Sequence, residues 1–286
     1  MKEKYQGALC MVLSALSFAI MQILIAVNAG AIPLFEQLFF RNLIAALLAL
    51  IGLCRNHVNP LGKPENRKIL ILRSASGYLG MMALFYASAH AAQGDVAILN
   101  KMSPFVVTLL AAIFLGQTVK RYHVLALVCA FAGAVLVSGP TFRSNFFPIF
   151  VAMLSALFTG VAYTSVSALR GRENPNVSIF FFSAFSTVLS AIVMSFHFVM
   201  PTPLQLLELL GIAACASAGQ FLLTRSYTMI PASEASIFNY SGIIFSTLLG
   251  YLLLKQKIAP TSYLGGALVL AAGAIVFLGQ RKELRT

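Results

Sequence analysis

Apolar stretches of about 20 residues follow one another along the whole chain, and they restrict its fold more than any other feature. Hydrophobic residues make up 59% of the 286 residues and charged residues only 10%, whereas soluble domains contain about 25% charged residues. Most of the stretches are apolar on all sides, so helices formed by them would have no polar face to present to water. The pattern predicts helices that span a lipid bilayer.

Ten such stretches can be delimited, and turn residues such as Asn59-Pro60 and Gly139-Pro140 mark the short connections between them. The first stretch is too long for the apolar part of a cleaved signal peptide, so we expect it to remain as a helix. The chain is therefore predicted to be an all-α integral membrane protein with ten transmembrane helices. The predicted spans are residues 7–28, 34–53, 68–92, 95–117, 123–140, 146–170, 177–199, 204–227, 233–254 and 261–279.

Basic residues dominate the charge balance, with a formal net charge of +12. Most of the 20 Lys and Arg residues lie in the connections, where they orient membrane proteins, so we expect no nucleic-acid partner. If both termini are cytoplasmic, only Arg143, Lys255 and Lys257 in the connections face the other side. We therefore predict cytoplasmic termini in an inner (plasma) membrane. Lys255 and Lys257 either extend to the interface or indicate that the second half has one span more or fewer.

Motifs of metal-binding and catalytic proteins are absent from the sequence. The four cysteines are scattered, and the sequence contains no CxxC motif or Cys/His cluster. It also contains no Gly-rich phosphate loop, HExxH or GxSxG motif, which argues against an ATP-driven pump. We expect no catalytic residue, no metal and no cofactor.

One apolar segment with a polar stripe occurs twice, at residues 95–117 and 234–256, separated by 139 positions. Because positions i and i+7 share a face of a helix, each copy carries one polar stripe on an apolar rod. The chain is therefore predicted to be a duplication. The aligned polar pairs are Asp95 with Glu234, Asn100 with Asn239, Lys101 with Tyr240, Thr108 with Thr247, and Gln117 with Gln256.

Five spans in each copy place the second copy upside down relative to the first. We assign spans one to five to residues 1–142 and spans six to ten to residues 143–286. The fifth and tenth spans support the duplication, because AGAVLV at 132–137 matches AGAIVF at 272–277. Inverted repeats are frequent in secondary transporters, in which the substrate site lies near mid-membrane between the repeats.

The second half resembles an EamA repeat of the drug/metabolite transporter superfamily, in the segment GQFLLTRSYTMIPASEASIFNYSGIIFSTLLGYLLLKQ followed by LGGALVLAAGAIV. The first half agrees in FEQLFFRNLIAALL at 35–48, ILRSASGYLGMMALFYASAHAA at 71–92 and Pro104. The resemblance covers nearly the whole chain. The patterns FExxFFR and ILRxxxG are also similar to the branch that contains S-adenosylmethionine carriers.

The resemblance implies a ten-helix carrier with cytoplasmic termini. Spans one to four and six to nine would surround a central cavity, with spans five and ten packed behind it. Substrates of such carriers include amino acids, nucleotide-like metabolites, amines and vitamins. The family often has Glu at the ends of the fourth and ninth helices, where this chain has Gln117 and Gln256.

Two cations are the strongest candidates for substrate contact, because a charge inside the bilayer costs about 2.5–3.5 kcal/mol on insertion scales. Arg41 lies well inside span two, and Glu36 is about 140° away around the same helix. Arg41 therefore pairs with an acid on another helix or contacts an anionic substrate. Lys101 either extends to the outer surface or faces the cavity, where it would meet a carboxylate.

Uncharged polar groups complete the candidate site. Asn100 and Asn239 either line the cavity or form interhelical hydrogen bonds. Tyr78, Tyr163, Gln220 and Tyr240 suit an organic substrate with a ring or an amide, although lone tyrosines are also common at membrane interfaces. The predicted substrate-binding residues are Arg41, Tyr78, Asn100, Lys101, Tyr163, Gln220, Asn239 and Tyr240.

Other polar and small residues are assigned structural roles. We expect Arg73 and Arg225 to extend to the interface, and Asp95 and Glu234 to stabilise helix starts. Pro104 either bends the fourth helix or serves as a gating hinge. Small residues suit close contact between spans five and ten. They are Ala126, Ala130 and Ala134 in span five, and Ala267, Ala271 and Ala274 in span ten.

These observations favour a secondary or facilitative transporter of small polar organic metabolites that works by alternating access. Arg41 and Lys101 would favour a carboxylate-bearing, amino-acid-like substrate, and we expect export. The alternative is uptake of S-adenosylmethionine or a similar nucleoside or amine metabolite. A lipid-modifying membrane enzyme or a non-transporting scaffold is a remote alternative. The expected partners are the bilayer and a small-molecule substrate, with the protein a monomer or weak homodimer.

Overall fold

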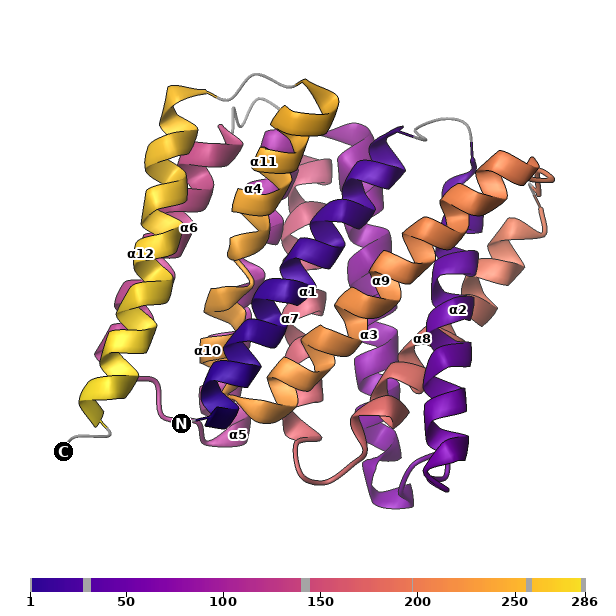
Figure 1. Cartoon of the computed structure of the whole chain (residues 1–286), viewed down its shortest axis with the longest axis horizontal. Helices are drawn as coiled ribbons and strands as arrows, with labels where there is room; N and C mark the ends of the chain where they lie inside the picture. The colour runs from indigo at the N-terminus through magenta and orange to yellow at the C-terminus, as the bar shows by residue number, and fades with distance from the viewer. Residues whose placement is uncertain (1, 28–31, 140–144, 197, 256–258, 284–286) are drawn as a thin grey trace.

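In the computed structural model of the chain, all regular secondary structure is helical over the described residues, which are all except 1, 28–31, 140–144, 197, 256–258 and 284–286. Helices α1 to α12 form one bundle, and a short 3-10 helix, η1, precedes α3 (Figure 1). The bounds in the first repeat are α1 Lys2–Val27, α2 Leu34–Arg55, η1 Pro64–Asn66, α3 Arg67–His90, α4 Gln93–Asn100, α5 Ser103–Leu115 and α6 Arg121–Ser138. The bounds in the second are α7 Phe146–Ala168, α8 Pro175–Met194, α9 Pro203–Met229, α10 Ala232–Phe238, α11 Ser241–Leu254 and α12 Pro260–Glu283.

Ten segments of the described chain are long and apolar enough to cross a membrane, which confirms the predicted number. The boundaries agree with the prediction to within a few residues. Spans four and nine each consist of two helices, α4 with α5 and α10 with α11. The second half contains five spans, so the position of Lys255 does not indicate a missing or an extra span. Lys255 lies directly after α11, and its left-handed backbone (φ 53°) ends that helix. Lys257 lies outside the described residues.

The two repeats interlock through matching pairs of helices. Helix α1 packs along α9, and the corresponding pair from the other repeat, α7 with α3, packs in the same way. Equivalent helices also pair directly, α2 with α8 and α6 with α12. Helix α1 begins and α12 ends at the same end of the bundle, which we call the terminal end (Figure 1).

Helices α6 and α12 cross at very close range at one side of the bundle (Figure 1). A Cβ added to Gly133 would collide with the carbonyl oxygen of Gly265, and the reverse is equally true. The predicted small face of span five is correct, since Ala126, Ala130 and Ala134 are fully buried. The predicted face of span ten is wrong, because Ala267, Ala271 and Ala274 are exposed. The buried face follows Gly265 and contains Val269, Ala272 and Val276.

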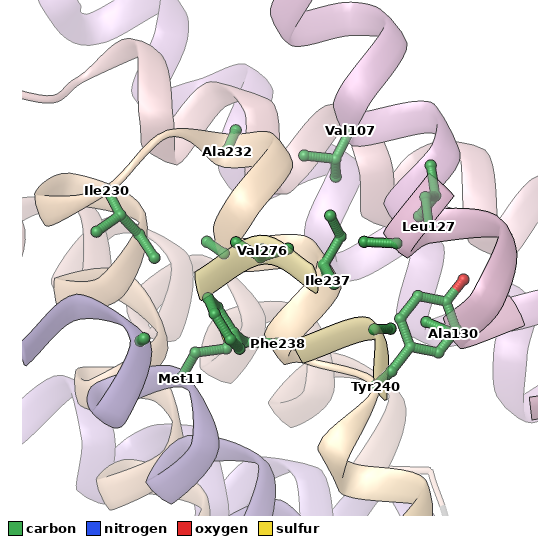
Figure 2. Packing of buried hydrophobic residues seen from close by; sticks show 14 of the residues in the cluster. Met11, Val107, Leu127, Ala130, Ile230, Ala232, Ile237, Phe238, Tyr240 and Val276 are labelled. Carbon is green, nitrogen blue, oxygen red and sulfur yellow. The ribbon is translucent and has the colours of Figure 1, made fainter. Parts of the chain in front are cut away.

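The largest hydrophobic cluster surrounds the short helix α10, every residue of which is buried. Figure 2 shows Phe238 next to Met11 of α1, and Tyr240 next to Ala130 of α6. Helix α10 thus begins span nine inside protein. The break that follows it lies against the α6–α12 pair, which fixes its position relative to both repeats.

Candidate functional site

Spans four and nine are interrupted at equivalent positions, and the two interruptions contact each other. Helix α4 ends at Asn100, and α10 ends at Phe238. Beyond α4 the N–H groups of Phe105 and Val106 bond to the Met102 carbonyl, so the helical ladder restarts there. The Tyr240 hydroxyl donates a hydrogen bond to the Lys101 carbonyl at 2.7 Å, and these two residues are partners in the duplication.

A proline alone does not explain both breaks. Pro104 lies in the first turn of α5, as expected for a residue without an N–H, but α11 begins with Ser241-Gly242 and contains no proline. A broken helix at membrane depth persists only where protein or water satisfies its freed backbone groups. The Tyr240 hydroxyl does so for Lys101, and each break therefore stabilises the other.

The repeats are joined at the terminal end of the bundle. Helix α5 packs against α10, whereas no comparable packing joins α4 to α11 within the described residues. Gln117, which follows α5, donates from Nε2 to the Ser167 hydroxyl (3.2 Å) and accepts the Ala232 N–H (2.9 Å). Within the second repeat, Arg170 donates to the Met229 carbonyl at the end of α9. The equivalent Gln256 lies outside the described residues.

Two arginines from different helices each interact electrostatically with one tyrosine. Arg41 of α2 and Arg73 of α3 both lie within electrostatic range of the Tyr163 hydroxyl on α7. Arg41 and Tyr163 are partly buried, while only 2% of Arg73 is exposed. Within the described chain, neither guanidinium forms an ion pair, and Arg73 Nε has no hydrogen-bond partner.

The position of Arg73 contradicts the expectation that it extends to the membrane interface. Its Cζ lies 4.1 Å from the centroid of the Phe182 ring on α8, in a cation–π contact. Gly77, one turn further along α3, leaves the room for the guanidinium, because a Cβ there would collide with both Arg73 and Phe182. The spacing of Arg73 and Gly77 was visible in the sequence, but the stacking partner was not. Arg225 is exposed on α9, and its extension to the membrane interface stays a prediction.

Tyr227 of α9 lies beside Tyr163 and was missed from the sequence. Its ring centroid is 5.2 Å from that of Tyr163. Tyr227 is completely buried, and its hydroxyl has no hydrogen-bond partner in the described chain. Tyr163 and Tyr227 thus connect α7 with α9.

Some of the remaining predicted site residues are only partly buried, and others contact a neighbouring side chain. Lys101 is partly buried, and its ammonium group forms no hydrogen bond or ion pair within the described chain. Asn100 donates from Nδ2 to Ser155 Oγ of α7 at 3.1 Å, while the matching Asn239 is partly buried. The Gln220 amide donates to the Thr224 hydroxyl at 3.3 Å. The Tyr78 ring lies edge-on to Phe185, with centroids 6.2 Å apart.

The two aligned acids lie in first turns of helices, as predicted for Asp95 in α4 and Glu234 in α10. Both are buried. Glu234 Oε1 is 3.6 Å from His123 Nε2 of α6, so this acid also ties α10 to the α6–α12 pair. In the described part of the chain, no group of three His, Cys, Asp or Glu residues could hold a metal ion.

Comparisons with known proteins indicate a membrane transporter over most of the chain. The model of the EamA-like transporter family matches twice, at residues 5–139 and 146–278. The chain is 30% identical over 269 residues to a pseudopaline exporter of Pseudomonas aeruginosa, covering 93% of this chain and 94% of the relative. It is 20% identical over 254 residues to an S-adenosylmethionine uptake transporter of Rickettsia bellii, covering 87% and 86%.

A protein of known crystal structure shares the fold. The two structures superpose with a TM-score of 0.83 over 96% of this chain and 98% of the other, at 17% sequence identity. At that identity the likeness concerns the arrangement of helices alone.

Proposed function

Because the chain belongs to the EamA-like transporter family, with two EamA repeats and ten spans, we propose that it exports small polar organic metabolites that bear carboxylate groups. Membership of the family makes it a membrane transporter and not an enzyme. The carried substrate, the direction and the residues that bind the substrate belong to the proposal.

The choice of substrate class rests on one observation, which is that the Arg41 guanidinium has no acidic partner among the described residues. Arg41 lies inside span two and forms no ion pair within the described residues. Glu36, the acid nearest to it in sequence, accepts the backbone N–H of Val199 at 2.6 Å instead. A charge inside a membrane protein is retained where it is paired, hydrated or used for transport. A substrate carboxylate would supply the missing negative charge.

The transport mechanism we propose is alternating access between the two repeats. The α5–α10 contact and the Gln117 hydrogen bonds join the repeats at the terminal end. Since α4 and α11 lack a comparable contact within the described chain, this arrangement corresponds to a carrier that is closed toward the terminal end. If the α5–α10 contact opened and a contact between α4 and α11 formed, the substrate site would become accessible from the other side of the membrane.

Export is favoured over uptake by the similarity to the pseudopaline exporter. The second candidate is uptake of S-adenosylmethionine or a related nucleoside or amine metabolite, supported by the more distant Rickettsia relative. We rank it lower because two unpaired guanidinium groups would repel a positively charged sulfonium or amine.

The positions of the basic connections favour both termini in the cytoplasm of a cell with an inner membrane. We propose a monomer or weak homodimer.

Substitution of the two candidate cations tests the proposal. Arg41→Ala and Lys101→Ala are each expected to lower carboxylate counterflow at least about tenfold, because each removes a hydrogen bond to a charged group. The measurement uses purified protein in liposomes with radiolabelled amino acids and organic carboxylates, and thermal unfolding shows that each variant remains folded.

Arg225→Ala is the matched control, since Arg225 is an exposed arginine of α9 and should keep wild-type rates. Wild-type counterflow from both Arg41→Ala and Lys101→Ala would contradict the proposed binding residues. Stabilisation by S-adenosylmethionine, without any effect of carboxylates, would favour the second candidate.

A further inference from the structure

Arg73 is a buried cation without a negatively charged partner. Only 2% of the residue is exposed, and within the described chain it forms no ion pair. Its Nε atom is shielded from solvent and has no hydrogen-bond partner. A buried donor without an acceptor destabilises the fold, and so does an uncompensated buried charge. In a membrane protein such a charge is retained where it is paired, hydrated or used for transport.

The acids of the chain do not supply the missing negative charge. Glu36 accepts the Val199 N–H, and Glu234 lies against His123. Glu173 accepts hydrogen bonds from the connection between α2 and α3. Across the described ranges, no acidic side chain forms an ion pair with Arg73.

The surroundings of the Arg73 side chain cover its face and leave one edge without a partner. The Phe182 ring of α8 lies on the guanidinium, with 4.1 Å between Cζ and the ring centroid. Gly77 leaves room for this stack, because a Cβ there would collide with Arg73 Nη1 and lie 2.9 Å from Phe182 Cε2. Guanidinium N–H groups point outward in the plane, where they match the two oxygens of a carboxylate. A carboxylate would therefore bind edge-on, beside the ring.

Arg73 and Arg41 lie toward opposite ends of the bundle. Helix α3 begins at the terminal end, whereas α2 begins at the opposite end (Figure 1). At a rise of 1.5 Å per residue, Arg73 is about 9 Å from the start of α3 and Arg41 about 10 Å from the start of α2. Arg73 is thus the cation nearer the terminal end.

The contact that covers Arg73 also crosses from one repeat to the other. Helix α3 belongs to the first repeat, and it packs against α8 of the second. Because alternating access moves the repeats relative to each other, it would change the contact between Arg73 and Phe182. An arginine that is buried while the terminal end is closed can thus become accessible when that end opens.

Resting on the proposed function, we infer that Arg73 is a substrate-binding residue, which holds the carboxylate while the terminal end is open. The carboxylate binds the in-plane edge of the guanidinium. When the terminal end closes, Phe182 of the other repeat covers Arg73, and Arg41 then holds the carboxylate nearer the opposite end.

Ligand pairs that differ by one carboxylate test the inference on purified full-length protein. The probes are lactate with lactamide, succinamate with succinamide, and N-acetylglycine with its amide. Apparent affinity is measured from thermal stabilisation, since a ligand that binds only the folded state raises its stability. The wild-type protein is expected to bind at least one carboxylate roughly tenfold more tightly than its amide, the effect of one hydrogen bond to a charged group.

Arg73→Gln is expected to lower that ratio several-fold, and Arg73→Lys, which keeps the charge without the planar fork, should retain part of it. Phe182→Leu separates binding from packing, because it removes the stack and keeps the guanidinium. It should lower the unfolding temperature but preserve the carboxylate preference. Arg225→Gln, at an exposed position of α9, should change neither quantity. A preference that survives unchanged in Arg73→Gln would overturn the inference.

Chemical modification of the wild-type protein tests the inference without a variant that could fail to fold. Phenylglyoxal reacts with accessible guanidinium groups, and peptide mapping of protein in liposomes identifies the modified arginines. Arg73 is expected to react as the carrier opens, and several-fold more slowly with a bound carboxylate than with its amide. Arg225 should react equally in all samples. The absence of any reaction at Arg73 would show that the substrate never reaches it.

The outcomes also separate this inference from the proposed function. Carboxylate counterflow with an unchanged ratio in Arg73→Gln would leave the proposed function standing and remove Arg73 from the binding site. No binding and no counterflow for any member of the panel would remove both.

Discussion

At the scale of single residues, the molecule makes room for a buried charge with a glycine. Arg73 occupies space between α3 and α8 that a side chain at position 77 would fill, and the Phe182 ring covers its guanidinium. Cation–π contacts contribute more when the cation is desolvated, as Arg73 is. Gly77 thus supports the position of Arg73 although it carries no functional group.

Gly77→Ala should therefore displace Arg73 and also press on the Phe182 ring, because the added Cβ would collide with both side chains. We expect counterflow to fall several-fold and the free energy of unfolding to fall by about 1–3 kcal/mol, the usual cost of overpacking. Gly211→Ala serves as the control, since its nearest non-local atom would be an ordinary 3.5 Å away. Unchanged transport by Gly77→Ala would show that the position of Arg73 does not matter.

At the scale of helices, the breaks in spans four and nine are a coupled pair. The Lys101 carbonyl, which lies at the end of α4, is satisfied by a hydroxyl from the equivalent residue of the other repeat. Helix α10 is held on all sides by the largest hydrophobic cluster, and α5 packs against it. In the alternating-access mechanism that we propose, relative movement of the repeats would pass through this point, where the chain is not continuous helix.

Tyr240→Phe removes that hydroxyl and keeps the ring. Interhelical hydrogen bonds in membranes contribute about 0.6 kcal/mol on average and up to about 1.7, so we expect a small decrease in unfolding temperature. The transport rate should fall clearly even though the unfolding temperature changes little, because the hydrogen bond that joins the two helix breaks is lost. Tyr251→Phe, at an exposed position of α11 (52% exposed), should change neither quantity. Equal behaviour of the two variants would argue against coupled breaks.

At the scale of the whole molecule, the two repeats are also tied together outside the spans. Glu173, between α7 and α8, accepts hydrogen bonds from the Lys63 N–H (2.9 Å) and from Asn66 Nδ2 (3.0 Å), which lie between α2 and α3. Burial by itself raises the pKa of the Glu173 carboxyl, but these bonds, the Asn174 N–H and the Lys63 charge outweigh it. The net effect is a pKa below the ordinary value of glutamate.

A lowered pKa in the folded state means that the Glu173 contact stabilises the protein above the unfolded pKa of about 4.3. The contribution is lost as pH falls through the lower, folded value. Glu173→Gln should thus decrease the unfolding temperature at pH 6–7 relative to wild type, and the difference should shrink toward pH 3. Glu65→Gln, an exposed acid in η1, is the control. A difference that is constant with pH would refute the role of the charge.

Much of the architecture follows from local sequence. The thickness of the bilayer sets the length of each apolar stretch, so the ten spans could be delimited without contacts. The duplication set the inverted arrangement, because five spans per repeat reverse the direction of the second copy. The small face of α6 was also predicted correctly, whereas the face of α12 was misplaced because several small residues lie all around that helix.

The candidate site depended on contacts between residues far apart in the chain. The sequence identified Arg41 as a charge in need of a partner, but it could not show that Arg73 is buried under the Phe182 ring. Nor could it show that the Tyr240 hydroxyl is committed to the Lys101 carbonyl. Hydropathy and periodicity are properties of one helix in lipid, so the sequence alone determined the spans and the inversion of one repeat relative to the other. Which side chains meet between helices depends on how ten rods pack together, and only the tertiary structure decides that.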